Sequence, residues 1–253
     1  IDTLDLTDYV SLEEFLKANR PEIIINCAAY TAVDKAEEEP EKAYLINAEI
    51  PGRLALLSGK YNAYLIHTST DYVYDGRNYK PYKENDLPNP LSVYGKSKFI
   101  GDQKVLQFDN TIVIRTSWLY SQFGNNFVKT MLRLGKERDT LNIVFDQTGT
   151  PTNARDLASA IMSFTELLNK GEHISGIFHF SNEGLCSWYD FAKEIIDYAG
   201  FTCNVLPITT EKYPLPASRP QYSVLDKSKI KKALSITIPH WKDSLMECLK
   251  HLT

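Results

Sequence analysis

The segment from Tyr64 to Ser69 reads YLIHTS, a nearly continuous run of apolar and β-branched residues with the length of one strand. Strands that are apolar on both faces are typical of a parallel sheet covered by helices on both sides. Residues 23–29, 111–115 and 176–180 have the same character. The chain is therefore expected to contain a parallel sheet built on these segments.

Helical patterns lie between the predicted strands. Ser11 is followed three residues later by Glu14, as in a capping box at the start of a helix. Residues 38–57 favour a longer helix in spite of Pro51, and residues 153–168 and 188–199 are apolar at helical spacing. Alternating strands and helices predict an α/β fold with a doubly wound parallel sheet.

The composition is that of an ordinary globular chain, with 43% apolar residues, 24% charged residues and a formal net charge of -4. No basic run is present, so we expect no nucleic-acid partner. The longest apolar stretches fall short of the roughly 20 residues of a membrane span, and no signal peptide opens the chain. We therefore expect no membrane partner and a cytoplasmic location.

Cysteines and acidic residues predict no metal site. The four cysteines are scattered at Cys27, Cys186, Cys203 and Cys248, without a C-x-x-C pair. This spacing favours neither a zinc site nor a disulfide framework, and it is typical of a reducing compartment. The acidic run Glu37–Glu39 is interpreted as a solvated helix start.

The beginning of the chain departs from the expected pattern. A doubly wound dinucleotide-binding domain opens with a strand, a glycine-rich turn and a helix, yet no G-x-G-x-x-G or G-x-x-G-x-x-G spacing occurs. Residues 1–8 resemble the loop after a second or third strand. Either about 30 residues, the size of one βαβ unit, precede Ile1 in the full protein, or no dinucleotide binds. The rest of the sequence favours the first explanation.

Tyr94 and Lys98 stand four residues apart in the segment YGKSK. On a helix this spacing places them on one face, one turn apart. A phenol has a pKa of about 10, too high for efficient proton transfer near neutral pH. A nearby lysine ammonium is expected to lower that pKa. The pair is predicted to give a proton to a ketone oxygen while a hydride reaches the carbon, and Ser69 and Thr70 offer hydroxyls to polarise that ketone.

Several segments together carry a resemblance to a known family. The chain resembles the extended short-chain dehydrogenase/reductases and, within them, the dTDP-4-dehydrorhamnose reductases. The matching segments are residues 26–34, 69–72, 89–98, 115–120, 124–127, 146–152 and 216–220. The resemblance implies a Rossmann-like fold with a smaller C-terminal lobe. Residues 1–120 and 152–182 would form the NAD(P)-binding domain, whose N-terminal βαβ unit is missing, and residues 121–151 and 183–253 the substrate-binding lobe.

The resemblance implies a role for each matching residue. Thr70, Tyr94 and Lys98 would be catalytic, with Tyr94 as the acid. The cofactor would contact Ala28, Ala29, Tyr30, Ser69, Tyr94 and Lys98. The substrate would contact Val33, Asp71, Tyr72, Trp118, Asn126, Phe127 and Arg219. The guanidinium of Arg219 suits a diphosphate because it donates two parallel hydrogen bonds.

The implied reaction is reduction of dTDP-4-dehydro-β-L-rhamnose to dTDP-L-rhamnose by NADPH or NADH. The resemblance also allows a Mg²⁺ ion and a homodimer. Sugar-nucleotide dehydratases carry an Asp-Glu pair after the threonine, whereas Tyr72 follows Asp71 here, which argues for reduction alone. Epimerases of the superfamily stay open. So does a non-catalytic protein like the regulatory subunit of methionine adenosyltransferase, although the complete set of Thr70, Tyr94 and Lys98 argues against it.

Overall fold

Four parallel strands form the central sheet in the order β1-β2-β3-β8. Their bounds are β1 Ile23–Asn26, β2 Tyr64–Thr70, β3 Thr111–Thr116 and β8 Gly176–His179. These are the strands predicted from the apolar segments, so that prediction is confirmed. The computed structural model describes residues 4–252, and the first three residues of the predicted loop at residues 1–8 lie outside this range.

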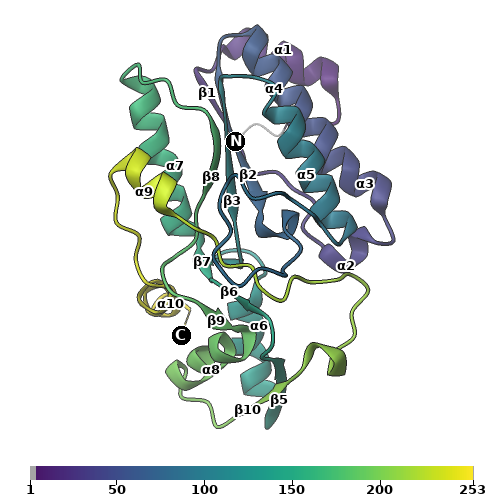
Figure 1. Ribbon diagram of the computed structural model, residues 1–253, viewed down its shortest axis with the longest axis vertical. Coiled ribbons are helices and arrows are strands. Elements are labelled where there is room, and N and C mark those ends of the chain that lie inside the picture. The colour runs from purple at the N-terminus through teal and green to yellow at the C-terminus, as the bar shows by residue number, and fades with distance from the viewer. Residues whose placement is uncertain (1–3, 253) are drawn as a thin grey trace.

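Helices cover both faces of the sheet, as a doubly wound fold requires (Figure 1). The helices of one face are α1 (Tyr9–Asn19), α4 (Ile50–Lys60) and α5 (Val93–Val105), and those of the other are α7 (Ala154–Asn169) and α9 (Ser228–Leu234). Successive side chains of a strand point to opposite faces. Leu65 of β2 accordingly packs with Leu12 of α1, whereas Ile66 packs with Phe164 of α7.

Two helix predictions were wrong at their boundaries. Asp8 caps α1 by accepting hydrogen bonds from the backbone amides of Val10 and Ser11, so Ser11 lies inside the helix. The long helix expected over residues 38–57 is divided into α3 (Pro40–Tyr44), a π-helical turn (Leu45–Glu49) and α4. Pro51 stands in the first turn of α4, directly after the π-helical turn.

A second group of elements packs below the sheet in Figure 1. It consists of β4 (Leu119–Tyr120), α6 (Phe127–Glu137), β5 (Thr140–Val144), β6 (Thr148–Gly149), β7 (Thr152–Asn153), β9 (Cys186–Ser187), α8 (Trp188–Tyr198), β10 (Asn204–Ile208) and α10 (Trp241–Leu249). Helices α7 and α8 confirm two sequence predictions. Side chains from these elements form one apolar cluster around Phe191. The predicted domain boundaries stay a prediction. Ile230 and Ile238, which that prediction assigns to the substrate-binding lobe, pack with the apolar cluster of the sheet.

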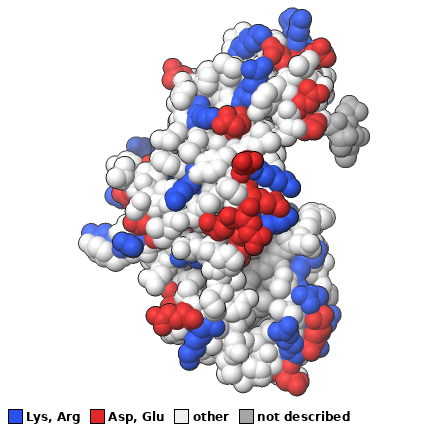
Figure 2. All heavy atoms as spheres, turned by 90° about the vertical axis from the view of Figure 1, so that its right-hand side faces the viewer, with Lys and Arg blue, Asp and Glu red and all other residues white. Residues whose placement is uncertain are grey.

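Charges of both signs are spread over the face shown in Figure 2, without a broad basic area. Within residues 4–252, no helix combines the length and the apolar character that a membrane crossing requires.

Candidate active site

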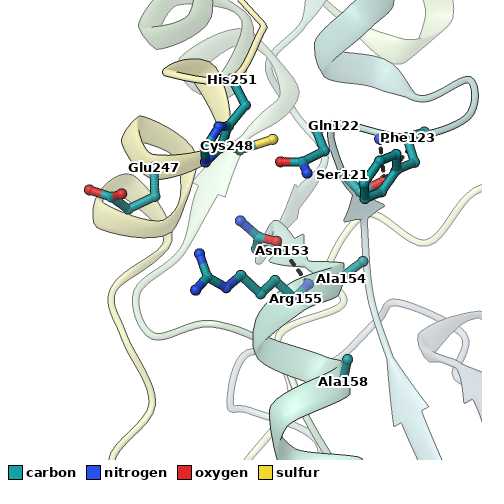
Figure 3. Close-up of a pocket in the computed structure, with 10 residues that line it drawn as sticks. All are labelled: Ser121, Gln122, Phe123, Asn153, Ala154, Arg155, Ala158, Glu247, Cys248 and His251. Carbon is teal, nitrogen blue, oxygen red and sulfur yellow. Dashed lines mark hydrogen bonds between the residues drawn. The ribbon is translucent and has the colours of Figure 1, made fainter.

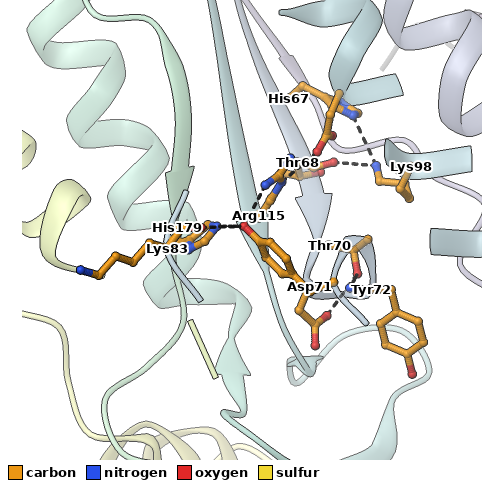
Figure 4. A network of polar contacts seen from close by, with 11 residues as sticks. His67, Thr68, Thr70, Asp71, Tyr72, Lys83, Lys98, Arg115 and His179 are labelled. Atoms are coloured by element: carbon orange, nitrogen blue, oxygen red, sulfur yellow. Dashed lines mark hydrogen bonds and ion pairs between the residues drawn. The ribbon is translucent and has the colours of Figure 1, made fainter. Parts of the chain in front are cut away.

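The carboxyl end of β2 leads directly into the candidate site. Thr70 ends the strand, and its Oγ1 accepts a hydrogen bond from the Tyr72 amide at 3.2 Å. This contact caps a 3₁₀ turn, η2 (Asp71–Val73), which places Asp71 and Tyr72 beside the strand end (Figure 4). Open α/β sheets hold their ligand sites at this edge.

Helix α5 brings Tyr94 and Lys98 to the same edge. Ser92 caps the helix, its Oγ accepting a hydrogen bond from the Gly95 amide at 3.1 Å. A Cβ on Gly95 would lie 2.3 Å from the carbonyl oxygen of Tyr72. The glycine between the two predicted catalytic residues is therefore needed for the close approach of α5 to the turn after β2.

The environment of Tyr94 contradicts one expectation. Its ring meets that of Tyr72 edge to face, with 5.4 Å between the ring centroids. Burial raises the pKa of Tyr94 to about 12, against a smaller lowering by a hydrogen bond with Thr70. The expected lowering by Lys98 was wrong for this structure, because the Lys98 Nζ instead donates to the carbonyl oxygen of Thr68 at 2.7 Å. Burial therefore has a larger effect on the pKa of Tyr94 than its hydrogen bond with Thr70.

Lys98 is 1% exposed, and burial lowers its pKa to about 8, against raising effects of Asp102 and Cys27. Its Nζ lies 3.4 Å from Nε2 of His67, which is fully buried on β2 (Figure 4). The two groups that contact Nζ of Lys98, the Thr68 carbonyl and the His67 ring, both belong to β2. Lys98 is thus held against β2 by polar contacts.

A buried ion pair lies one turn beyond Lys98. Asp102 Oδ2 accepts a hydrogen bond from Arg115 Nε at 3.0 Å, and the two side chains are 0% and 1% exposed. Arg115 Nη1 also donates to the Tyr74 hydroxyl at 2.8 Å, which lies 2.9 Å from Nε2 of His179. This network ties α5 to β3 and β8, and Figure 4 shows Arg115 and His179 within it.

The predicted cofactor-binding residues lie after β1 and at the end of β2. Ala28 is exposed and Ala29 half-buried, so their small side chains leave the backbone of this segment open. Tyr30 is buried instead, with its hydroxyl donating to Glu39 at 2.9 Å and its amide to Asn47 at 2.8 Å. Ser69 Oγ is buried and has no hydrogen-bond partner among the described residues.

The predicted substrate residues lie in two places. Val33 opens the short helix α2 (Val33–Ala36), and its neighbour Asp34 binds Arg219 through both carboxylate oxygens, at 3.0 and 2.7 Å. Arg219 also holds down the pKa of Asp34. Asp71 is 2% exposed, and burial raises its pKa to about 7.

The other substrate residues lie in the second group of elements. Trp118 stacks on Trp188 with 3.6 Å between the ring centroids, and Phe127 packs against the same tryptophan at 4.6 Å. Asn126 caps α6, where its Oδ1 accepts a hydrogen bond from the Lys129 amide. The sequence interpretation did not single out Trp188, His67 or Asp34.

A cavity of about 420 Å³ lies elsewhere, between the start of α7 and α10 (Figure 3). Phe123, Arg155 and His251 are among its lining residues, and none of the predicted site residues is. Among residues 4–252, no cluster of three or more His, Cys, Asp or Glu side chains could hold a metal ion.

Comparisons with known proteins agree with this geometry. The curated dTDP-4-dehydrorhamnose reductase of Aggregatibacter actinomycetemcomitans is 43% identical over 251 residues, covering 96% of this chain and 85% of that protein. The crystal structure of dTDP-4-dehydrorhamnose reductase from Bacillus anthracis in complex with NADP has a TM-score of 0.92 and 41% identity, covering 98% of this chain and 86% of that one. The ortholog from Clostridium acetobutylicum has the same TM-score and 43% identity. These matches confirm the resemblance stated from the sequence. Residues 1–253 match the family described as RmlD substrate binding domain, and the chain therefore belongs to that family.

Proposed function

We propose that this chain is the NADPH-dependent reductase that converts dTDP-4-dehydro-β-L-rhamnose to dTDP-L-rhamnose. The observation that carries the proposal is the meeting of Thr70, Tyr94 and Lys98 at the carboxyl end of β2. The names of the relatives supply the substrate: proteins 43% and 41% identical are dTDP-4-dehydrorhamnose reductases.

Tyr94 is suited to act as an acid that keeps its proton until it is needed. With a pKa of about 12, the phenol stays protonated at neutral pH. The sugar oxygen becomes an alkoxide as the hydride arrives, and an alkoxide is a far stronger base than a phenolate. The proton therefore moves from Tyr94 to the sugar oxygen only once reduction begins, with Thr70 beside it to orient the carbonyl.

The edge formed by the ends of β1 and β2 fits a nicotinamide cofactor. We propose contacts with Ala28, Ala29 and Tyr30 and with the unpartnered hydroxyl of Ser69, and a contact of Lys98 with the ribose. NADPH supplies the hydride when bound. We favour NADPH over NADH because the Bacillus anthracis relative was solved with NADP.

The proposed substrate site spans both groups of elements. The deoxysugar would be surrounded by Val33, Asp71, Tyr72 and Trp118. Its nucleotide end would face Asn126, Phe127 and Arg219. We further propose the domain division given above. We also propose a homodimer, and sedimentation of the purified protein would test this oligomeric state. A cytoplasmic location is supported by the four cysteines, all free in this structure.

Replacing Arg219 by Ala is expected to raise KM for the dTDP-sugar by about 10- to 100-fold. This is the loss of affinity expected when charged hydrogen bonds to a diphosphate are removed. Steady-state kinetics with varied sugar concentration measures this change. Asp34→Asn is the matched control, because it also breaks the Asp34–Arg219 ion pair but keeps the guanidinium. Equal KM values in the two variants would show that Arg219 stabilises its loop through Asp34 and does not bind the diphosphate.

Replacing Lys98 by Met is expected to lower both kcat and the affinity for NADPH, because the residue is proposed to hold the ribose of the cofactor beside Tyr94. Fluorescence titration of the reduced cofactor gives the affinity independently of turnover. An unchanged affinity would remove the ribose contact from the account.

The proposed function is tested with the full-length protein, NADPH and dTDP-4-dehydro-6-deoxy-L-mannose. Consumption of reduced cofactor, followed by absorbance, and formation of dTDP-L-rhamnose, identified by mass spectrometry, are expected together. Absence of turnover with both NADPH and NADH would refute the reductase assignment.

A further inference from the structure

His67 is a buried titratable residue to which the proposed reaction assigns no role. Its Nδ1 lies 3.0 Å from Nδ2 of Asn26, and its Nε2 lies 3.4 Å from Nζ of Lys98 (Figure 4). The three side chains are between 0% and 4% exposed, so no contact with bulk water replaces these hydrogen bonds. Burial, with a smaller effect of Lys98, holds the pKa of His67 well below its ordinary value, so the ring is neutral.

The orientation of the Asn26 amide fixes which ring nitrogen carries the proton. Asn26 Oδ1 accepts a hydrogen bond from the Ala28 amide at 3.1 Å, which only an oxygen can do. The Asn26 NH₂ group therefore faces Nδ1 of His67 and donates to it. A neutral imidazole has one donor and one acceptor nitrogen, so its proton is on Nε2, facing Lys98.

A lysine ammonium has three N–H donors and no lone pair, whereas an amine has one lone pair. We propose that His67 is a positioning residue for Lys98: its Nε2–H donates to the lone pair of the Lys98 amine and so favours the uncharged side chain. The amine still donates to the Thr68 carbonyl at 2.7 Å. Formation of the ammonium requires the ring to move its proton to Nδ1 and the Asn26 amide to turn.

Other charged groups around Lys98 act in the opposite direction. Asp102 on α5 and Cys27 after β1 favour the ammonium, and burial opposes it more strongly. Arg115 on β3 neutralises Asp102, and Tyr94 on α5 stays a neutral phenol near pH 7. His67 is therefore the hydrogen-bonding partner on β2 that favours the amine.

The effect of His67 on the reaction, unlike its contact with Lys98, rests on the proposed function. By favouring the amine, His67 would set the pH above which Lys98 is uncharged at its proposed contact with the ribose. It would do so without touching the substrate.

Nuclear magnetic resonance tests the inference without any turnover, so its failure is distinct from failure of the proposed function. In the full-length protein labelled with ¹⁵N-histidine, the Nε2–H tautomer of His67 is expected above pH 8, where Lys98 is the amine. Titration of ¹³C-labelled lysine, with Lys98→Met to assign the signal, gives the pKa of Lys98. In His67→Phe that pKa is expected to rise by about one, a tenfold increase in the ratio of ammonium to amine.

Two further variants keep the result decisive. Asn26→Leu retains the ring but frees Nδ1, so the ring can take the other tautomer and the pKa of Lys98 is again expected to rise. His179→Phe removes the other fully buried histidine, which contacts Tyr74 rather than Lys98, and is expected to leave that pKa unchanged. A wild-type ring protonated on Nδ1 above pH 8, or a pKa of Lys98 that does not rise in His67→Phe and Asn26→Leu, would overturn the inference.

Discussion

Replacing Tyr94 by Phe is expected to lower kcat by about 10²- to 10⁴-fold, the usual contribution of a general acid, while the affinity for NADPH stays close to that of the wild type. The variant keeps the aromatic ring, so the edge contact with Tyr72 and the packing of α5 are retained. Only the proton that neutralises the sugar alkoxide is lost. Single-turnover kinetics with pre-bound NADPH measures this step directly.

Tyr72→Phe is the matched control for Tyr94→Phe, because both remove one hydroxyl from the same pair of rings. Burial raises the pKa of Tyr72 further than that of Tyr94, which makes its hydroxyl the poorer acid. Its loss is expected to change KM more than kcat. If Tyr72→Phe lost kcat and Tyr94→Phe did not, the acid would have been assigned to the wrong tyrosine.

Replacing Asp102 by Asn is expected to destabilise the fold by about 3–5 kcal/mol, the usual effect of leaving one charge of a buried pair without its partner. Arg115 would then be a buried cation between α5 and β3 that keeps its hydrogen bond to the Tyr74 hydroxyl. Equilibrium unfolding in urea, followed by circular dichroism, measures the change in the free energy of unfolding.

The exposed pair of Lys193 and Asp197 provides the comparison. Its members are one helical turn apart and about half exposed, so Asp197→Asn is expected to leave the urea midpoint close to that of the wild type. A double replacement of Asp102 and Arg115 by Leu is expected to recover stability relative to Asp102→Asn, because no buried charge remains. Equal midpoints for Asp102→Asn and wild type would contradict the importance of the buried pair.

The strands were predictable because burial on both faces leaves a continuous apolar run that a single sequence displays. The four segments around Ile24, Ile66, Val113 and Phe178 all pair as expected. Helix starts were less predictable, because Asp8 and Ser11 are both good caps and the geometry selects Asp8. The π-helical turn before Pro51 depends on how the chain passes α5, which local pattern does not encode.

Within the site, Thr70, Tyr94 and Lys98 were predictable because a strand end and a helical spacing of four are local features. The residues that contact these three could not be predicted from the sequence. The contact of Lys98 with His67 joins positions 31 residues apart, and the Asp34–Arg219 pair joins positions 185 apart. The acidity of Tyr94 also required the structure, since it depends on burial more than on the neighbouring lysine.

Transfer of isotope tests the central claim most directly. The full-length protein is mixed with NADPH carrying deuterium in both positions at C4 of the nicotinamide, together with dTDP-4-dehydro-6-deoxy-L-mannose. The account predicts dTDP-L-rhamnose with one deuterium at C4 of the sugar, formed far more slowly by Tyr94→Phe. Product without deuterium at C4, or an equal rate with Tyr94→Phe, would contradict it.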